Sequence, residues 1–466
     1  MPLQTLQDRY RCPERFFNCR TAPLTSAAGY FQFGSETVCY GRTTDTCVAR
    51  SNGSLIDVQA SVVADAGQLV LPFDLDEVVN NLRLERYPAS QMGTLEKYLK
   101  HIYYFLRPHT LPSVRHQIHR FRAGNWKSRQ FPQWPVDTSV ERICENALLA
   151  SMCAGGHDSV PFIWFWPRGA RSAVTMTHDV ETVAGRDFCT SLMDIDDRYG
   201  IKSSFQIVPE ARYAVTPEFL DEIRERGFEI CVQDLNHDGR LFDHRREFLR
   251  RAETINEYAR QYRARGYRSA VLYRNAEWLP DLEFSFDMSF PNVAHLDPQR
   301  GGCCTVMPYF IGPLLELPLT TTQDYTLFHV LGEQSLELWK AQTATVVARH
   351  GLVSFLVHPD YILTRERCAL YEALLSMLTD LRSNNQLWFA RPGEIDHWWR
   401  ARHQMSLVRR DWGWDIVGDG AEDAVVAFAT VVDGRLVYEI RDSQRVDEAA
   451  SSIRSMSGSE PVPITC

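Results

Sequence analysis

The chain has 466 residues, of which 44% are hydrophobic and 23% are charged, ordinary values for a globular protein of two or three domains. Its formal net charge of −9 disfavours nucleic acid and anionic membrane as partners. No apolar run reaches the roughly 18 residues that a membrane span requires. The N-terminus carries charges where a signal peptide would have its apolar core. We therefore expect a cytoplasmic protein whose 12 cysteines are reduced thiols.

Residues 1–145 have the pattern of an accessory region of mixed α and β structure. Short apolar runs separated by glycine, asparagine and serine predict strands, and two longer stretches predict helices. The predicted strands cover 29–33, 36–41, 54–63 and 68–73, and the predicted helical stretches are 74–87 and part of 94–122. Covering the mouth of a neighbouring domain is one hypothesis for this region.

From about residue 170 the chain alternates between predicted strands and helices. Thr216 and Pro217 illustrate the helix signals, since threonine caps a helix and proline favours its first position. Repeated strand–helix units of this kind predict a distorted (β/α) barrel of about seven strands over residues 146–400. Residues 401–466 are predicted to form a small β-rich tail with a disordered end. The predicted strands are 172–177, 202–208, 228–232, 268–272, 314–319, 352–357 and 386–390.

Polar side chains gather at the ends of these strands. In a parallel barrel the carboxyl ends of the strands meet at one rim, where active sites lie. Two carboxylates, two histidines and an arginine are therefore expected to converge there, although they are far apart in the sequence. Asp179, Glu181, Gln233, His237 and His358 follow predicted strands, and the strand over 268–272 begins with Arg268 and leads into Arg274.

These residue types suit the hydrolysis of an amide. Asp179 and Glu181 alternate along the chain, so one can act as a base while the other binds a metal ion. His358 titrates near neutral pH and suits a general acid, and Arg268 can pair with Asp179. His178 is expected to point away from these groups, in a core or supporting position. Each assignment has an ordinary structural alternative. Asp179 can cap the next helix, His237 can be bonded to the backbone, and Arg268 can form an ordinary surface ion pair.

Four short motifs, in this order, resemble those of the polysaccharide deacetylases of the NodB-homology type. Thr177–Glu181 resembles the first motif, in which two acidic residues end a strand. Gly227–Ile230 followed by Gln233–His237 resembles the second, a pair of histidines four positions apart. Tyr267–Ala270 and Leu356–His358 are similar to the third and the last. The resemblance covers about residues 170–395, and it implies a distorted (β/α) barrel that removes acetyl groups from glycans.

The resemblance also implies a role for each matching residue. Asp179 corresponds to the catalytic base and Arg268 to the residue that orients it. Glu181 and His237 correspond to ligands of a divalent metal ion, and His358 corresponds to the general acid.

Two positions depart from the family pattern. Glu181 stands in place of an aspartate, and Gln233 stands in place of the first histidine of the second motif. A neutral amide oxygen is a poorer zinc ligand than imidazole. Asp234 or Asp238 can compensate as a ligand, which would favour a harder ion such as Mn²⁺ over zinc. Asp234 and Arg274 are also candidates for substrate binding.

Three functions are consistent with these residues. The first is a metal-dependent deacetylase acting on an N-acetylated sugar or glycan precursor. The second is a hydrolase of a small amide that needs no metal, resembling the allantoinase branch of the superfamily. The third is a non-catalytic module that binds glycans or takes part in assembly, with tryptophans such as Trp164 and Trp398 stacking on sugars. The retention of Asp179, Arg268 and His358 favours an enzyme.

Overall fold

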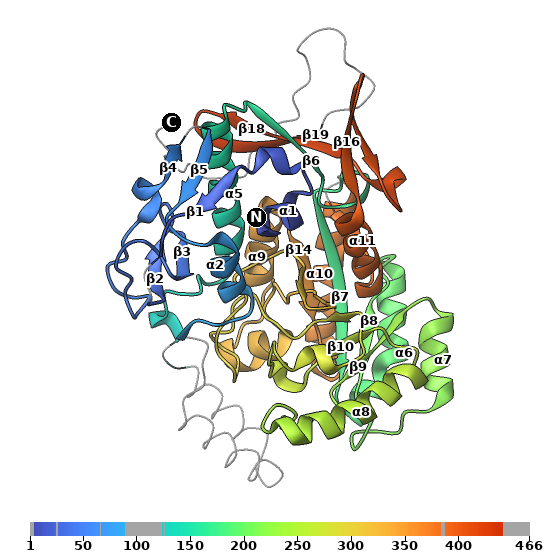
Figure 1. Cartoon of the computed structure of the whole chain (residues 1–466). Coiled ribbons are helices and arrows are strands. Elements are labelled where there is room, and N and C mark those ends of the chain that lie inside the picture. The colour runs from blue at the N-terminus through green and yellow to red at the C-terminus, as the bar shows by residue number, and fades with distance from the viewer. Residues whose placement is uncertain are drawn as a thin grey trace.

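The computed structural model describes two packed regions, an N-terminal α+β region and a curved parallel sheet surrounded by helices (Figure 1). No helix within the described residues is both long enough and apolar enough to cross a membrane. The predicted helical stretch within 94–122 and the end of the chain after 440 lie outside the described residues, which are 4–24, 27–65, 67–88, 124, 126–383 and 387–440.

The N-terminal region contains a three-stranded sheet in the order β1-β5-β4 and a separate pair, β2 and β3. The expected strand over 54–63 is wrong for most of its length. The Asp57 side chain accepts a hydrogen bond from the main-chain N–H of Gln59 and caps a 3-10 turn at Val58–Ser61. The bounds are α1 Gln4–Tyr10, β1 Cys19–Thr21, β2 Gly29–Gln32, β3 Val38–Gly41, β4 Val63–Asp65, β5 Gln68–Leu71, α2 Leu75–Arg83 and α5 Ser139–Gly155.

The second region confirms the predicted barrel-like α/β fold. Its sheet has 9 strands in the order β12-β13-β11-β10-β9-β8-β7-β14, with β15 also pairing with β7. All pairs are parallel except β12 with β13. The bounds are β7 Ser172–Val180, β8 Ser204–Ile207, β9 Glu229–Gln233, β10 Gly266–Arg268, β11 Phe286–Asp287, β12 Tyr309–Ile311, β13 Leu314–Glu316, β14 Leu352–Leu356 and β15 Leu387–Phe389.

Threonine side chains bridge the seam between β13 and β14, which no backbone ladder joins in the described part of the chain. Thr320 Oγ1 donates to the carbonyl of Leu352 at 2.7 Å and accepts from the N–H of Ser354 at 2.9 Å. Thr321 Oγ1 donates to the carbonyl of Ser354 at 2.8 Å. These bonds hold the segment after β13 against β14.

Strand β10 is shorter than the predicted strand over 268–272. It ends at Arg268, and Ala270–Leu272 forms a 3-10 turn in which Val271 has a φ of 58°. A β-branched residue with positive φ is strained, and such strain is typical of segments beside functional sites. The first residue of β10 is Gly266, and glycine is required there because a Cβ would lie 2.2 Å from the ring of Phe286. Arg268 is thus at the carboxyl end of its strand, on the same rim as the other candidate residues.

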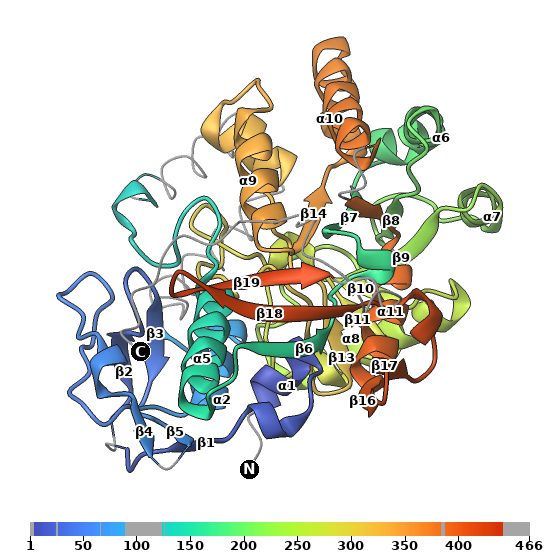
Figure 2. The ribbon, with the colours of Figure 1, turned by 90° about the horizontal axis from the view of Figure 1, so that it is seen from above.

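The helices lie outside the curved sheet (Figure 2). Thr216 accepts from the N–H of Phe219 and Pro217 follows it, so the predicted helix start is confirmed. Thr182 caps α6 in the same way by accepting from the N–H of Gly185. The bounds are α6 Val183–Arg198, α7 Pro217–Glu225, α8 Arg245–Gln261, α9 Glu337–Ala348 and α10 Arg365–Ser383.

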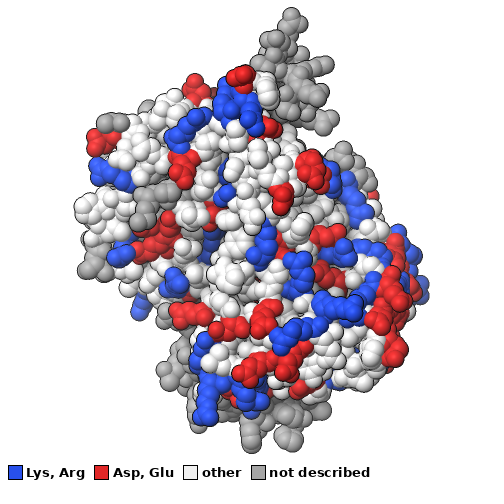
Figure 3. Space-filling view, turned by 45° about the vertical axis from the view of Figure 1, so that its right-hand side comes forward, with Lys and Arg blue, Asp and Glu red and all other residues white. Residues whose placement is uncertain are grey.

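Most basic residues of α8 are paired with acidic side chains. Arg250 contacts Glu247 at 2.6 Å and Arg251 contacts Asp238 at 2.9 Å. Acidic and basic side chains are interspersed over the face that Figure 3 shows. This arrangement is that of a solvated helix face and not of a phosphate-binding stripe.

The C-terminal strands pack on the N-terminal side of the molecule. β18 pairs with β19 and also with β6, so the predicted β-rich tail shares a sheet with a strand that precedes β7, within the range 146–400 predicted for the barrel. Trp164 and Trp166 are 1% and 0% exposed, and Trp398 is 7% exposed, so these side chains are core residues rather than sugar-stacking ones. The bounds are β6 Ser159–Ile163, α11 Pro392–Gln404, β16 Ser406–Arg410, β17 Gly413–Val417, β18 Val426–Val432 and β19 Arg435–Ile440.

The cysteines agree only in part with the expectation of reduced thiols. Among the described residues, ten cysteines are free thiols and Cys153 is disulfide-bonded. The adjacent Cys303 and Cys304 are both buried, and burial raises the pKa of each thiol. A buried thiol with a raised pKa is a poor nucleophile, which indicates a structural role for this pair.

Candidate active site

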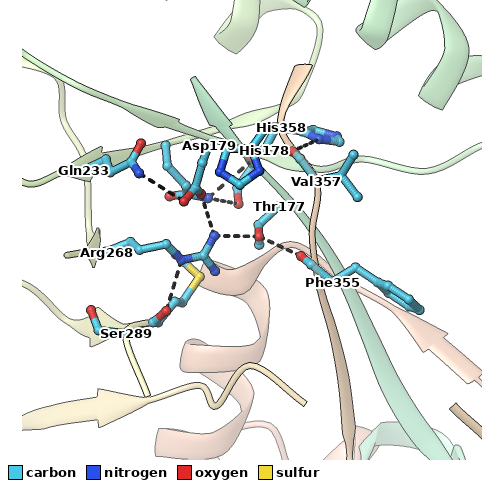
Figure 4. A network of polar contacts seen from close by, with 12 residues as sticks. Thr177, His178, Asp179, Gln233, Arg268, Ser289, Phe355, Val357 and His358 are labelled. Atoms are coloured by element: carbon cyan, nitrogen blue, oxygen red, sulfur yellow. Dashed lines mark hydrogen bonds and ion pairs between the residues drawn. The ribbon is translucent and has the colours of Figure 1, made fainter. Parts of the chain in front are cut away.

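Asp179 lies near the end of β7 and is held by a buried arginine (Figure 4). Arg268 Nη1 donates to Asp179 Oδ1 at 2.7 Å and to Thr177 Oγ1 at 2.8 Å. Arg268 Nε donates to the carbonyl of Met288 at 3.0 Å, and the residue is 0% exposed. Thr177 and Asp179 are two positions apart on one strand, so both face the same arginine. The position and direction of the Asp179 carboxylate are therefore fixed.

His178 points to the opposite side of β7, as the alternation predicts. Its Nδ1 lies 3.1 Å from the carbonyl of Val357, and its Nε2 lies 3.2 Å from Asp196 Oδ2. Both partners are outside the group around Asp179, and the ring is fully buried. His178 supports the fold at the end of β7.

His358 follows β14 and is held by Asp324. Its Nδ1 lies 2.6 Å from Asp324 Oδ1, and its main-chain N–H donates to Asp324 Oδ2 at 2.8 Å. Burial disfavours the charged imidazolium, but Asp324 and Glu181 outweigh it and raise the pKa of His358 well above its usual value. Asp324 was not predicted from the sequence. It follows Thr320 and Thr321 in the segment after β13 and does not lie at the end of a predicted strand.

Glu181 lies at the centre of the site, and three side-chain nitrogens approach its Oε1 atom. Gln233 Nε2 is 3.0 Å away, His237 Nε2 is 2.7 Å away and His358 Nε2 is 3.5 Å away. Burial opposes ionisation, but the two histidines hold the pKa of Glu181 well below its usual value. Gln233 Nε2 also donates to Asp179 Oδ2 at 3.0 Å, so one amide group links the two carboxylates.

His237 is held by Arg212, another residue that sequence interpretation did not identify. Arg212 Nη2 lies 3.2 Å from His237 Nδ1 and donates to the His237 carbonyl at 2.6 Å. Arg212 Nε donates to the carbonyl of Asn236 at 3.3 Å. His237 adopts a positive φ of 56°, a conformation that histidine adopts more readily than most residues. Arg212 lies between β8 and α7 and not in one of the four motifs, so nothing in the sequence marked it.

Part of this group has the arrangement of a metal site. Asp179, Glu181 and His358 each offer a ligand atom within 4.8 Å of the others, so together they can hold a metal ion. The ligand set expected from the sequence, Glu181, Gln233 and His237, fits a metal poorly. The Gln233 nitrogen and not its oxygen faces the carboxylates, and an arginine donor faces the second ring nitrogen of His237.

The two residues predicted to bind substrate are engaged elsewhere. Arg274 is 4% exposed, and its Nη2 and Nε donate to Glu85 Oε1 and Oε2 at 2.5 Å and 2.7 Å. Asp234 Oδ1 accepts from the N–H of Leu235 at 2.7 Å, and burial raises the pKa of Asp234. Asp238, the other possible ligand, is paired with Arg251. We therefore leave Asp234, Asp238 and Arg274 out of the site.

The structure thus brings together most of the residues predicted for the site. Six predicted residues form one connected group at the carboxyl rim of the sheet, and Thr177, Arg212 and Asp324 join it. The six are Asp179, Glu181, Gln233, His237, Arg268 and His358.

No family model matches the sequence, and no curated protein matches it. Among solved structures, the chain is similar to a putative polysaccharide deacetylase from Mycobacterium smegmatis, with 18% identity over 53% of this chain and 98% of that one, and a TM-score of 0.42. It is also similar to Puue allantoinase, with 15% identity over 50% of this chain and 92% of that one, and a TM-score of 0.41.

A third similar structure is a putative polysaccharide deacetylase involved in O-antigen biosynthesis from Bordetella bronchiseptica. The identity is 17% over 50% of this chain and 86% of that one, with a TM-score of 0.31. The matched structures include several deacetylases. All three TM-scores are below 0.5, so the function is inferred from the geometry of the site itself.

Proposed function

We propose that the protein is a hydrolase of carbon–nitrogen bonds that removes a small acyl group from an N-acylated sugar or a related small amide. One observation carries this proposal: Asp179 and His358 lie in one small group of polar atoms, and each is held by its own partner of opposite charge. One polar atom of Asp179 and one of His358 lie within 4.8 Å of each other, so the base and the acid are close enough to act on the same amide group. Arg268 holds the first residue and Asp324 holds the second.

The reaction follows from these positions. Asp179 accepts a proton from water as the water oxygen bonds to the amide carbonyl carbon. The tetrahedral intermediate then breaks its carbon–nitrogen bond while His358 Nε2–H donates a proton to the departing nitrogen. The products are a carboxylic acid and an amine. The raised pKa of His358 keeps its proton in place at neutral pH, and Asp324 holds the ring by Nδ1 so that Nε2 faces the site.

The burial of these side chains limits the acyl group. The side chains of Asp179, His237 and His358 are 4%, 2% and 5% exposed, and that of Glu181 is 17% exposed. Only a small acyl group of the substrate can therefore contact the acid and the base. We propose that this group is acetyl. We place the amine part, a sugar or a small planar amide, outside these buried groups at the rim.

Release of acetate and amine from a panel of substrates tests this function. The panel includes N-acetylhexosamines, their nucleotide-linked forms and small amides. In Asp179→Asn we expect kcat to fall by on the order of 10²–10⁴-fold with KM little changed, because the base acts in the transition state. Asp187→Asn is the matched control, since Asp187 is 57% exposed on α6. Unchanged kcat in Asp179→Asn would overturn the mechanism, and no turnover of any substrate would overturn the function.

A further inference from the structure

We propose that this site works without a metal ion, and that Arg212 and Gln233 hold the site in the arrangement that a cation would otherwise impose. The inference rests on the proposed function, since it concerns how the same carboxylates and histidines are positioned for amide hydrolysis. It is argued from the donors that surround Glu181.

The first step concerns the proton on His237. An arginine guanidinium only donates hydrogen bonds, so the contact of 3.2 Å between Arg212 Nη2 and His237 Nδ1 requires Nδ1 to be the acceptor. The ring proton is then on Nε2, the atom that lies 2.7 Å from Glu181 Oε1. A histidine that binds a metal through Nε2 needs a lone pair there, and it usually donates Nδ1–H to a carboxylate or carbonyl. In His237 the roles of the two nitrogens are exchanged, because Nδ1 accepts from Arg212 and Nε2 carries the proton.

The second step concerns Gln233. Its amide nitrogen lies 3.0 Å from both Asp179 Oδ2 and Glu181 Oε1, and an amide nitrogen has two hydrogens and no lone pair available for a metal. One amide group therefore satisfies both carboxylates. The Gln233 oxygen, which can bind a metal, is on the opposite side of the amide from the nitrogen that faces these acids.

The third step is the balance of charge. Asp179 is paired with Arg268 and Asp324 with His358. Arg212 places a third cation beside the ring of His237, while burial raises the pKa of the neighbouring Asp360 carboxyl. A metalloenzyme site of this kind has an excess of carboxylate that a divalent ion neutralises. Here fixed side chains supply the positive charge.

Arg212 and Gln233 are thus positioning residues. Arg212 acts through His237, and Gln233 sets the spacing between Asp179 and Glu181. Their removal should open the site to a metal, because His237 Nε2 becomes free to lose its proton and a histidine at position 233 supplies a second imidazole.

The experiment measures metal directly. Wild type, Arg212→Leu, Gln233→His and the double variant are purified without chelator, and zinc and manganese are quantified by elemental mass spectrometry. Binding of ZnCl₂ and MnCl₂ is then measured by titration calorimetry. Arg240→Leu is the matched control, since it removes the same charge from an exposed position in the loop that carries His237. We expect no stoichiometric metal in wild type or control, and about one zinc ion per chain in the double variant.

Two results of the metal measurements would overturn the inference. One is near-stoichiometric metal in wild type whose removal abolishes turnover. The other is a folded double variant that takes up no more zinc than wild type. The ¹⁵N NMR signals of His237, assigned by difference with His237→Asn, give a readout that does not depend on metal uptake. A proton on Nε2 in wild type supports the inference, and a proton on Nδ1 overturns it.

The outcome remains separate from that of the proposed function. Metal-dependent turnover would overturn this inference and leave the amide hydrolase intact. A metal-free wild type that hydrolyses none of the substrates would overturn the hydrolase and leave the assignment of Arg212 and Gln233 unaffected.

Discussion

His358 and His237 differ in the side chain that contacts Nδ1 of the ring. Both histidines direct Nε2 to Glu181 Oε1, at 3.5 Å and 2.7 Å. The Nδ1 of His358 faces the carboxylate of Asp324, whereas the Nδ1 of His237 faces the guanidinium of Arg212. The first partner stabilises a doubly protonated ring that can release a proton at Nε2, and the second fixes a single proton there. The partner at Nδ1 therefore decides what each histidine can do, although both share the same carboxylate.

The largest expected effect comes from replacing each histidine in turn. In His358→Asn we expect kcat to fall by on the order of 10²–10⁴-fold, because the departing nitrogen loses its proton donor. In His237→Asn we expect a loss of about tenfold, since the change removes one contact to Glu181. Acetate release under saturating substrate measures both. Equal losses in the two variants would contradict the division of roles between the two histidines.

A change of intermediate size is expected when the partner of His358 is neutralised. The raised pKa of His358 places the loss of its proton, and so the alkaline limb of kcat/KM, above its usual range. Asp324→Asn removes the nearest negative charge, so the imidazolium is less stable and the alkaline limb should move to lower pH. We expect roughly tenfold lower activity at neutral pH, the value of one charge-assisted hydrogen bond.

The full pH profile of kcat/KM measures this shift. Asp238→Asn serves as the control, because Asp238 pairs with Arg251 and not with either histidine. A limb that stays in place in Asp324→Asn would mean that Asp324 only positions the ring.

The half of the site around Asp179 and His358 could be predicted from the sequence. Asp179 lies at the end of one predicted strand and His358 directly follows another, and strand ends are where a parallel barrel gathers its reactive groups. Arg268 was expected to begin a strand and instead ends one, because the chain turns at Ala270–Leu272. A short motif nevertheless singled it out as a partner of Asp179, and the structure places the two residues in contact.

The other half could not be predicted, because it depends on contacts that have no local signature. Arg212 reaches His237 across 25 positions of sequence, from a loop that resembles any other polar connection. Asp324 is placed by the threonine seam, which forms only when β13 and β14 come together. The contact that engages Arg274 is equally non-local, because its partner Glu85 lies 189 positions away in the N-terminal region.

The smallest expected effect is on stability, and it separates the charge pair at His358 from the contact at His237. The pKa of Glu181 is lowered by folding, so its contribution is present above its unfolded value of about 4.3 and is lost as pH falls through the folded pKa. The pKa of His358 is raised by folding, so its contribution is present below about 6.5 and is lost as pH rises through the folded pKa. Both contributions are complete between about pH 4.3 and 6.5.

Glu181→Gln removes the first contribution and weakens the second, so the melting temperature should fall most within that window and less on either side. We expect a loss on the order of 1–3 kcal/mol there, the cost of leaving buried donors without their charged acceptor. Thermal melts at intervals of pH measure the effect, with Glu247→Gln on the exposed face of α8 as the control. A uniform loss at every pH would mean that packing, and not charge, makes Glu181 stabilising. His237→Asn removes the contact of 2.7 Å to Glu181, so its melts at the same pH values show how much of the loss that contact explains.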